Sequence, residues 1–463
     1  MAGIGFELRR LTQRDDLAGV VQGYGYAALT TSGPWLFTML ALSAIVALGM
    51  PATTPEGLAT FRSVIVYNFA FSLVFSAPVT AVATRRLADY IYQKDVKQAP
   101  ALLMGSLALV YCASLPVVIP FYLFFVKLGP VLRLLSILNF ALVTGIWGVT
   151  VFLTALKSYR AVTWAFLGGM ALGVVAAGVL AYGWGMEGML TGFNLGLAVI
   201  FFTLLSRVLA EYPTRANQPF AFLEYFHRYW NLAAAALVYN IAVWADKWIM
   251  WSAPGREVLA NGLFSHPDYD GAMFLAYLSI VPSVAAFTLS IETGFYEHYL
   301  RFYTDIQKHA PHERIEANQR ELIRSFLDGA RSFLILQASI SLVAILLAPQ
   351  LLTALGINLR QLGIFRFGLA GAFFQAGYLF LSIILSYFDQ RRIQLALSVL
   401  LLLTNGTFTL LSLRLGFPFY GYGYFLSALI GFGCSFMAAG RLISHLPYHT
   451  FVTMNTSISR NSR

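Results

Sequence analysis

The chain has 463 residues, of which 58% are hydrophobic and only 11% are charged. Soluble domains carry roughly a quarter charged residues, so this composition excludes a soluble globular protein and indicates an integral membrane protein. The formal net charge is +10. We interpret it as basic residues at the cytoplasmic membrane surface, which attract anionic membrane lipid, and not as a sign of nucleic-acid binding.

Stretches without charged residues predict the membrane spans, because a span needs about 20 apolar residues and charge inside it is costly. The first half of the chain holds 17–55, 63–84, 98–126, 134–156, 161–186 and 188–206. The second half holds 229–245 with its extension to Trp251, 271–291, 332–359, 367–388, 393–413 and 415–440. A thirteenth stretch, 442–459, is rich in Ser, Thr and His and is set aside. The sequence therefore predicts an all-α protein with twelve transmembrane helices.

Basic residues set the orientation of these spans. An even number of spans places both termini on one side of the membrane. If that side is the cytoplasm, it receives 22 of the 31 Lys and Arg residues and the opposite side receives 7. Because cytoplasmic loops are enriched in Lys and Arg, we expect a multi-pass protein of the bacterial inner membrane with cytoplasmic N and C termini.

A polar linker divides the predicted spans into two sets of six. The linker, 207–228, contains Pro213 and Pro219 and lies between the bundles 24–206 and 229–440. Both sets would enter from the cytoplasm, as in transporters built from parallel repeats. We therefore expect two six-helix bundles around a central cavity.

Three further segments are predicted to lie at the cytoplasmic surface. Residues 1–23 carry an amphipathic pattern typical of an interfacial helix, and 441–463 form a polar tail. The segment 297–328 is rich in charge, and Pro311 splits it. It is predicted to form two short amphipathic helices on the membrane surface.

Catalysis is not expected. The longest outward loop, about 252–271, is too short for a catalytic domain, and the chain has no P-loop motif. The cysteines Cys112 and Cys434 lie in apolar runs. The grouping of His298, His309, His312 and Glu313 fits no standard zinc spacing. The sequence predicts neither enzyme activity, nor a cofactor, nor a metal.

The pair Asp246-Lys247 lies near the outer end of the seventh span, with Trp244 and Trp248 beside it. Ionisable groups at such a depth face a cavity or pair with each other. Tryptophans on both sides are also typical of an interfacial anchor. Glu292 and Arg331 lie near the cytoplasmic interface, where they are either simple interface residues or parts of a gate. We include Asp246, Lys247, Trp244, Glu292 and Arg331 in a candidate substrate path.

Two further features complete the candidate path. Gly33-Pro34 interrupts the first span, so that a helix starting there could present its positive end to an anionic group, although a plain kink is the simpler reading. Amides within or beside the spans could contact sugar hydroxyls or bond neighbouring helices, which is their commoner role. These amides are Asn68, Asn139, Asn194, Asn240 and Asn405, of which Asn68 and Asn240 are placed in the path.

A resemblance adds to this reading. The opening 1–11, Tyr24-Gly25-Tyr26-Ala27 and Ser32-Gly33-Pro34-Trp35 resemble the start of PelG-type Pel exopolysaccharide transporters, and the likeness extends over the whole chain. Asp246-Lys247 is similar to a signature shared widely among polysaccharide flippases. The resemblance implies membership of the multidrug/oligosaccharidyl-lipid/polysaccharide exporter superfamily, whose two bundles form a V around a cavity.

The same resemblance implies the cargo and the partners. It suggests export of an amino-sugar exopolysaccharide for the biofilm matrix, from cytoplasm to periplasm, by alternating access or as a conduit. The implied partners are a cytoplasmic glycosyltransferase and a cyclic-di-GMP receptor. The alternatives are a flippase for lipid-linked oligosaccharide, a drug or cation antiporter, a polytopic glycosyltransferase, and a scaffold with a vestigial cavity. No carboxylate lies in the middle of spans one, two or eight, which argues against an antiporter.

Overall fold

The computed structural model describes residues 32–94, 96–155, 159–213, 217–259 and 261–446. The predicted interfacial segment 1–23 and most of the tail 441–463 lie outside the described residues. The chain divides into two compact units. Unit 1 comprises Met1–Asp270 and Val284–Glu292, and unit 2 comprises Gly271–Ser283 and Thr293–Arg463.

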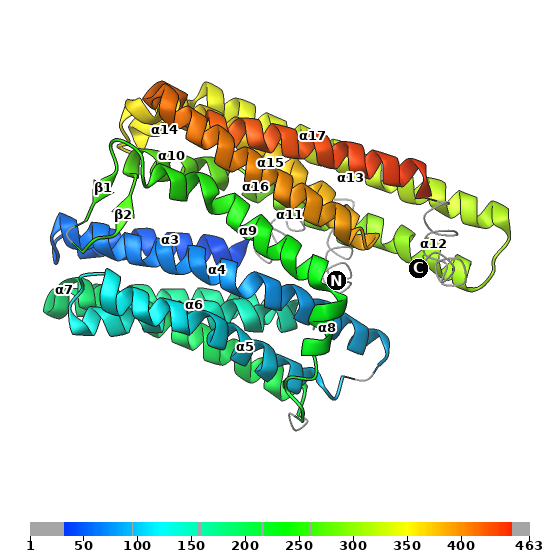
Figure 1. The fold of residues 1–463 in the computed structure, drawn as a ribbon, viewed down its shortest axis with the longest axis horizontal. Helices are drawn as coiled ribbons and strands as arrows, with labels where there is room; N and C mark the ends of the chain where they lie inside the picture. The colour runs from blue at the N-terminus through cyan, green and yellow to red at the C-terminus, as the bar shows by residue number, and fades with distance from the viewer. Residues whose placement is uncertain (1–31, 95, 156–158, 214–216, 260, 447–463) are drawn as a thin grey trace, which may run out of the picture. The chain divides into compact units, whose positions relative to one another are not determined.

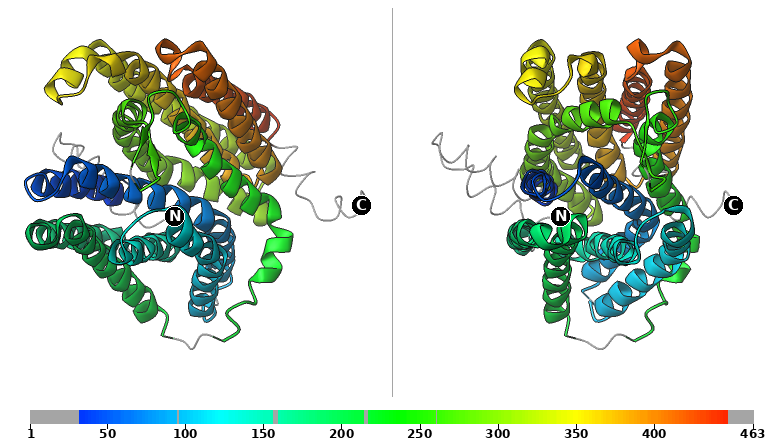
Figure 2. Two further views of the ribbon diagram at one scale, coloured as in Figure 1. Left: turned by 60° about the vertical axis from the view of Figure 1, so that its left-hand side comes forward. Right: turned by 90° about the vertical axis from the view of Figure 1, so that its left-hand side faces the viewer.

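Unit 1 consists of long helices and one small hairpin (Figures 1 and 2). Its helices are α3 (Gly33–Gly49), α4 (Pro55–Tyr92), α5 (Ala99–Pro120), the π-helix η1 (Phe121–Phe125), α6 (Pro130–Ala155), α7 (Tyr159–Glu211), α8 (Leu223–Arg228) and α9 (Trp230–Met250). The strands β1 (Glu257–Val258) and β2 (Phe264–Ser265) pair antiparallel, with Val258 opposite Phe264. Helix α4 packs against α6 and α9, and α7 packs against α3 and α6.

Unit 2 holds most of the remaining helices. They are α10 (Pro267–Leu278), α12 (Tyr296–Gln307), α13 (His312–Leu346), α14 (Ala348–Ala354), η3 (Leu359–Gln361), α15 (Leu362–Tyr387), α16 (Arg391–Leu415), η4 (Phe417–Phe419) and α17 (Tyr422–Ser444). The unit boundaries fall within or beside α10, α11 (Val281–Ser290) and the π-helix η2 (Ile291–Phe295). Helix α17 packs against α15 and α16, and α13 packs against α12 and α15.

Helix α7 is a hairpin of two arms that reverses at Gly185. This residue has φ 54° and ψ −129°, a conformation that glycine tolerates and other residues rarely adopt. Glycines bring the arms together: a Cβ on Gly192 would lie 2.1 Å from the nitrogen of Ala177, and one on Gly196 would lie 2.5 Å from the oxygen of Gly169. Small residues allow such close approach of membrane helices. The predicted spans 161–186 and 188–206 correspond to these two arms.

Ten helices in the described part of the chain are long and apolar enough to cross a membrane. The α7 hairpin counts once among them, and α3, with 17 residues, is counted separately as a shorter apolar helix. Each predicted span therefore overlaps an apolar helix. This confirms the all-α membrane class, while the number twelve and the two-bundle arrangement stay predictions.

The segment 297–328 does not form two short helices, and that prediction was wrong. Its first part is α12, but its second part continues without a break into the next predicted span as α13, a helix of 35 residues. Pro311 precedes the first residue of α13. Proline is tolerated before or at the first turn of a helix, because no hydrogen bond of the helix needs its missing N–H. One helix therefore joins the polar segment to the membrane.

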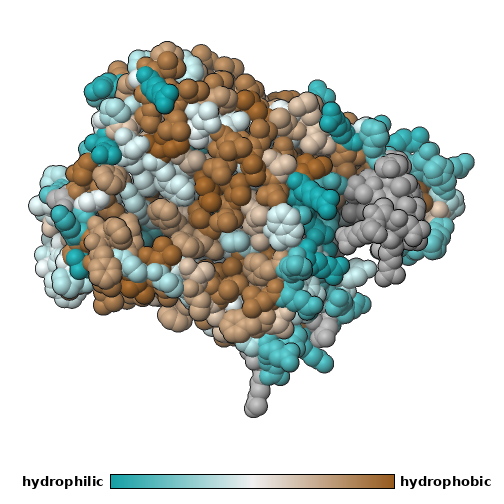
Figure 3. Space-filling model, in the orientation of Figure 1, coloured by the Kyte–Doolittle hydropathy of each residue, from teal (hydrophilic) through white to brown (hydrophobic). Residues whose placement is uncertain are grey.

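Hydrophobic side chains dominate the helix surfaces, as a membrane requires (Figure 3). On α7, Val179 is 68% exposed and Phe202 is 61% exposed. Hydrophilic side chains gather near α8 in unit 1 and, in unit 2, near α12. Exposed apolar surface on this scale marks contact with lipid or with another protein.

Candidate functional site

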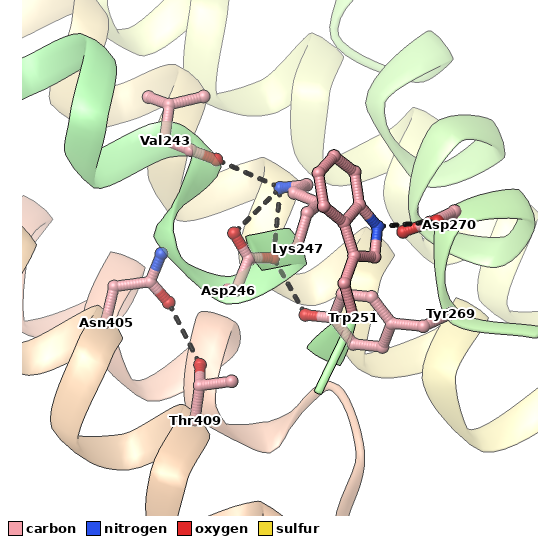
Figure 4. Close-up of polar contacts among 8 residues, drawn as sticks. All are labelled: Val243, Asp246, Lys247, Trp251, Tyr269, Asp270, Asn405 and Thr409. Atoms are coloured by element: carbon pink, nitrogen blue, oxygen red, sulfur yellow. Dashed lines mark hydrogen bonds and ion pairs between the residues drawn. The ribbon is translucent and has the colours of Figure 1, made fainter. Parts of the chain in front are cut away.

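The C-terminal turn of α9 holds a buried ion pair. Lys247 Nζ lies 3.0 Å from both carboxylate oxygens of Asp246, and it also donates to the Val243 carbonyl at 3.1 Å (Figure 4). Asp246 is 0% exposed and Lys247 is 8% exposed. The cation lies where the helix dipole favours positive charge, at the carbonyl end. Of the two alternatives considered from the sequence, facing a cavity or pairing with each other, the structure shows the pairing.

A tyrosine from α10 completes this pair. The Tyr269 hydroxyl, also fully buried, donates to Asp246 Oδ2 at 2.8 Å. A hydrogen bond to a charged acceptor is stronger than one between neutral groups. We call Asp246, Lys247 and Tyr269 the ion-pair cluster, and it links the end of α9 to the start of α10.

A second carboxylate lies one residue further along. Asp270 Oδ2 accepts from the Trp251 indole N–H at 2.9 Å and from the His266 backbone N–H at 3.1 Å. His266 Nδ1 accepts from the Tyr269 backbone N–H at 3.3 Å. Burial lowers the pKa of His266 from its usual value of 6.5, which favours the neutral ring that this acceptor role needs.

Aromatic rings bind this end of α9 to α4. Trp251 stacks on Tyr67 with ring centroids 4.5 Å apart, and Trp248 stacks on Phe71 at 5.1 Å. The Tyr67 hydroxyl donates to the Phe264 carbonyl of β2 at 3.0 Å. Offset stacking adds about 0.5–1.5 kcal/mol per pair beyond burial. These two tryptophans therefore pack against α4 within unit 1.

Asn68 belongs to a different structure, which we call the amide network. Asn68 Nδ2 donates to Asn139 Oδ1 at 2.9 Å, and Asn139 Nδ2 donates to Asn194 Oδ1 at 2.8 Å. The Tyr122 hydroxyl donates to Asn68 Oδ1 at 2.7 Å. These side chains come from α4, α6, α7 and η1, and all four are buried. Asn68 thus bonds neighbouring helices, the alternative role considered from the sequence, and we leave it out of the path.

The other predicted path residues lie on α3, α9, η2 and α13. Gly33 begins α3 and Pro34 lies in its first turn; residues before Ser32 lie outside the described ranges. Asn240 and Trp244 are half-buried on α9, and Asn240 donates to the Ala236 carbonyl of its own helix.

Two more candidates lie on other helices. Glu292 lies in the π-helix η2. Arg331 is exposed on α13, in unit 2. In unit 2 as well, Asn405 is buried and accepts from the Thr409 hydroxyl at 3.3 Å. Of the predicted set, the structure joins Asp246 and Lys247 by direct contact.

Sequence reasoning missed Tyr269, Asp270 and Trp251. They lie in or beside a segment that was treated as an outward loop, and Asp268-Tyr269-Asp270 is separated from Asp246 by more than 20 residues. The signal available in the sequence was the position of two carboxylates, Asp268 and Asp270, just before the apolar stretch 271–291. No group of three metal-ligating side chains occurs among the described residues.

A comparison with protein families finds a match over nearly the whole chain. The family model PelG, described as "Putative exopolysaccharide Exporter (EPS-E)", matches residues 1–451. A search of curated proteins found no match.

Solved structures share the fold. An outward-facing multidrug resistance MATE transporter of the MOP superfamily has a TM-score of 0.64 and 16% identity, over 96% of this chain and 99% of that one. A MOP superfamily transporter from Pyrococcus furiosus, described as having a binding pocket of reversed polarity, has a TM-score of 0.60 and 15% identity, over 90% and 96% of the two chains. At such identity these structures show the transporter fold alone.

Proposed function

The chain belongs to the PelG family of exopolysaccharide exporters, and we propose that it moves an amino-sugar polymer of Pel type from the cytoplasm to the periplasm. The membership and the transporter fold establish a multi-pass membrane transporter of the exporter superfamily. The sugar, the direction, the inner-membrane location and the cytoplasmic termini are parts of the proposal. So are the partners, a cytoplasmic glycosyltransferase and a cyclic-di-GMP receptor.

The observation that carries the mechanism is the ion-pair cluster. Charge inside an otherwise apolar helix is costly, so ionisable groups at such depth generally serve function. Here both residues are buried, with Asp246 0% and Lys247 8% exposed, and Asp246 is bound by both Lys247 and Tyr269. We infer that the cluster is a closed outer gate, whose polar groups become available to sugar hydroxyls when the end of α9 moves.

Movement of α9 would require its aromatic contacts with α4 to separate. From the sequence we propose rocking of 24–206 against 229–440, with spans one, two, seven and eight along the path. In the structure α9 packs on α4 within unit 1. The proposal therefore requires the ring pairs Tyr67–Trp251 and Phe71–Trp248 to open during each transport cycle. Trp244 and Asn240, half-buried on the same helix, remain proposed path residues, as do Gly33, Pro34, Glu292 and Arg331.

A reversible cross-link tests this gate. The variant Phe71→Cys/Trp248→Cys, in a background with Cys112→Ser and Cys434→Ser, would join α4 to α9 under oxidation. We expect polymer secretion to stop on oxidation and to return with a reductant. Each single cysteine variant is the control for loss of the ring. Secretion that persists with the bond fully formed would show that α9 does not leave α4 during transport.

Transport itself is tested in proteoliposomes. The purified protein, together with a glycosyltransferase that supplies the polymer, should deliver hexosamine polymer across the bilayer. Failure with free polymer but success with a lipid-linked sugar would identify a flippase instead. Movement of drugs or cations without either sugar would identify an antiporter, and failure with every cargo would refute the transport proposal.

A further inference from the structure

An open groove runs between the two arms of α7, at the ends far from the turn at Gly185. Ala161, Trp164, Ala165 and Gly168 line it from the first arm, and Thr203 and Arg207 from the second. Its volume is about 570 Å³, within the range of small-molecule sites. The groove is separate from the ion-pair cluster, and its lining residues take no part in the proposed transport path.

The groove forms because small residues line the first arm of α7 beyond the point where the two arms touch. The arms touch tightly at Gly169 and Gly196. Beyond that contact the first arm presents alanines and Gly168, and a Cβ on Gly168 would meet nothing within 4 Å. Small side chains thus leave a furrow along an apolar surface where two ordinary packed helices would fill the space.

The polar character of the groove is confined to one end. Arg207 is its single charged lining residue. Among the described residues, no carboxylate forms an ion pair with Arg207, which lies near the C-terminal end of α7. Trp164 is 68% exposed at the rim, and exposed tryptophans favour the level of the lipid headgroups. An apolar groove with one positive charge at the level of the headgroups is complementary to a ligand that has an apolar chain and one negative charge.

We propose that the α7 groove binds an anionic glycerophospholipid, with one acyl chain between the arms and the phosphate at Arg207. The predicted topology places this end of α7 at the cytoplasmic leaflet, whose anionic lipids attract basic side chains. Charge complementarity selects an anionic lipid over a zwitterionic one. The site does not depend on the proposed export function, since binding is measured without any polysaccharide.

Binding to the purified full-length protein in detergent tests the headgroup contact. Native mass spectrometry would follow titration with phosphatidylglycerol and, separately, with phosphatidylcholine. We expect tighter binding of phosphatidylglycerol, and about fivefold weaker binding of it in Arg207→Gln, the effect of one basic side chain near an anionic surface. The matched control is Arg392→Gln, another exposed arginine near a helix end. Equal affinity for both lipids, or equal effects of the two substitutions, would overturn the proposal.

A second pair of variants tests the acyl-chain contact. Gly168→Leu places a large apolar side chain in the lining of the groove and creates no clash at its Cβ. Gly183→Leu is the control, since it lies on the same arm outside the groove and its Cβ also meets nothing within 4 Å. We expect Gly168→Leu to weaken binding of phosphatidylglycerol at least as much as Arg207→Gln does, and Gly183→Leu to leave it unchanged. Unchanged binding in Gly168→Leu would place the lipid elsewhere.

Discussion

The amide network and the ion-pair cluster are both buried polar groups of unit 1, and they differ in charge and in what holds them. The amide network joins neutral side chains of α4, α6, α7 and η1 by hydrogen bonds of 2.7–2.9 Å. The ion-pair cluster places two charges next to each other on one helix and completes them with one hydroxyl. Removing one member of a neutral network leaves a buried neutral group unsatisfied, at a cost of about 1–3 kcal/mol, whereas a buried charge without its partner costs about 3–5 kcal/mol. We therefore assign the neutral amide network to permanent helix packing and the ion pair to the proposed gate.

Removal of one charge should have the largest effect. Asp246→Ala leaves the buried Lys247 ammonium without its carboxylate, and we expect a loss of about 3–5 kcal/mol of stability together with loss of export. Thermal unfolding in detergent, followed by tryptophan fluorescence, measures the first effect, and a polymer secretion assay measures the second.

The double variant Asp246→Leu/Lys247→Met separates stability from function. Apolar replacement of a buried pair is often neutral or stabilising, so we expect near-native stability. Export should still be lost, because the substitutions remove the charged groups of the proposed gate. If the double variant exports normally, the pair has only a structural role.

Two tyrosine hydroxyls allow a matched comparison of the two regions. Tyr269→Phe removes a hydrogen bond to a carboxylate, with an expected cost of about 1.5–3 kcal/mol. Tyr122→Phe removes one to a neutral amide oxygen, with an expected cost of about 0.5–1.5 kcal/mol. Unfolding midpoints measured side by side test the difference. Equal costs would mean that charge does not distinguish the regions.

Substitution inside the amide network should affect export less than substitution in the ion-pair cluster. Asn139→Leu keeps the branched shape and the number of heavy atoms of the side chain and breaks its bonds to Asn68 and Asn194, for an expected loss of about 1–3 kcal/mol. Export per folded molecule should stay at the wild-type level. A defect in export without a loss of folded protein would place this network in the substrate path after all.

The smallest effect is expected from His266, which lies beside the ion-pair cluster. Burial lowers its pKa in the folded protein, so the unfolded chain takes up a proton more readily. Stability is then present above pH 6.5 and is lost as pH falls below it. His266→Gln removes this titration while leaving the neighbouring acids in place. Between pH 7.5 and 5.5, the unfolding midpoint should fall more in the wild type than in the variant, and equal slopes would contradict the assignment.

Hydropathy and charge along the chain are enough to predict the membrane class and the positions of the spans. Absence of charge over about 20 residues is a local property, and each predicted span overlaps an apolar helix. The sequence placed Asp246 and Lys247 together near the end of a span and left open whether they pair, which the structure shows that they do. The family signature at 1–11 and 32–35 also needed no coordinates.

The partners of these elements, in contrast, are visible only in the folded protein. The sequence does not distinguish an amide that packs helices together from one that binds a substrate. The hydrogen bonds that join α4, α6 and α7 assign Asn68 to packing. Tyr269 reaches Asp246 from 23 positions away, and the α7 groove arises from the spacing of two arms that fold back at Gly185. Charge and hydropathy can be read within one segment of the chain. The polar contacts and the groove depend on which helices become neighbours, and packing over the whole chain decides that.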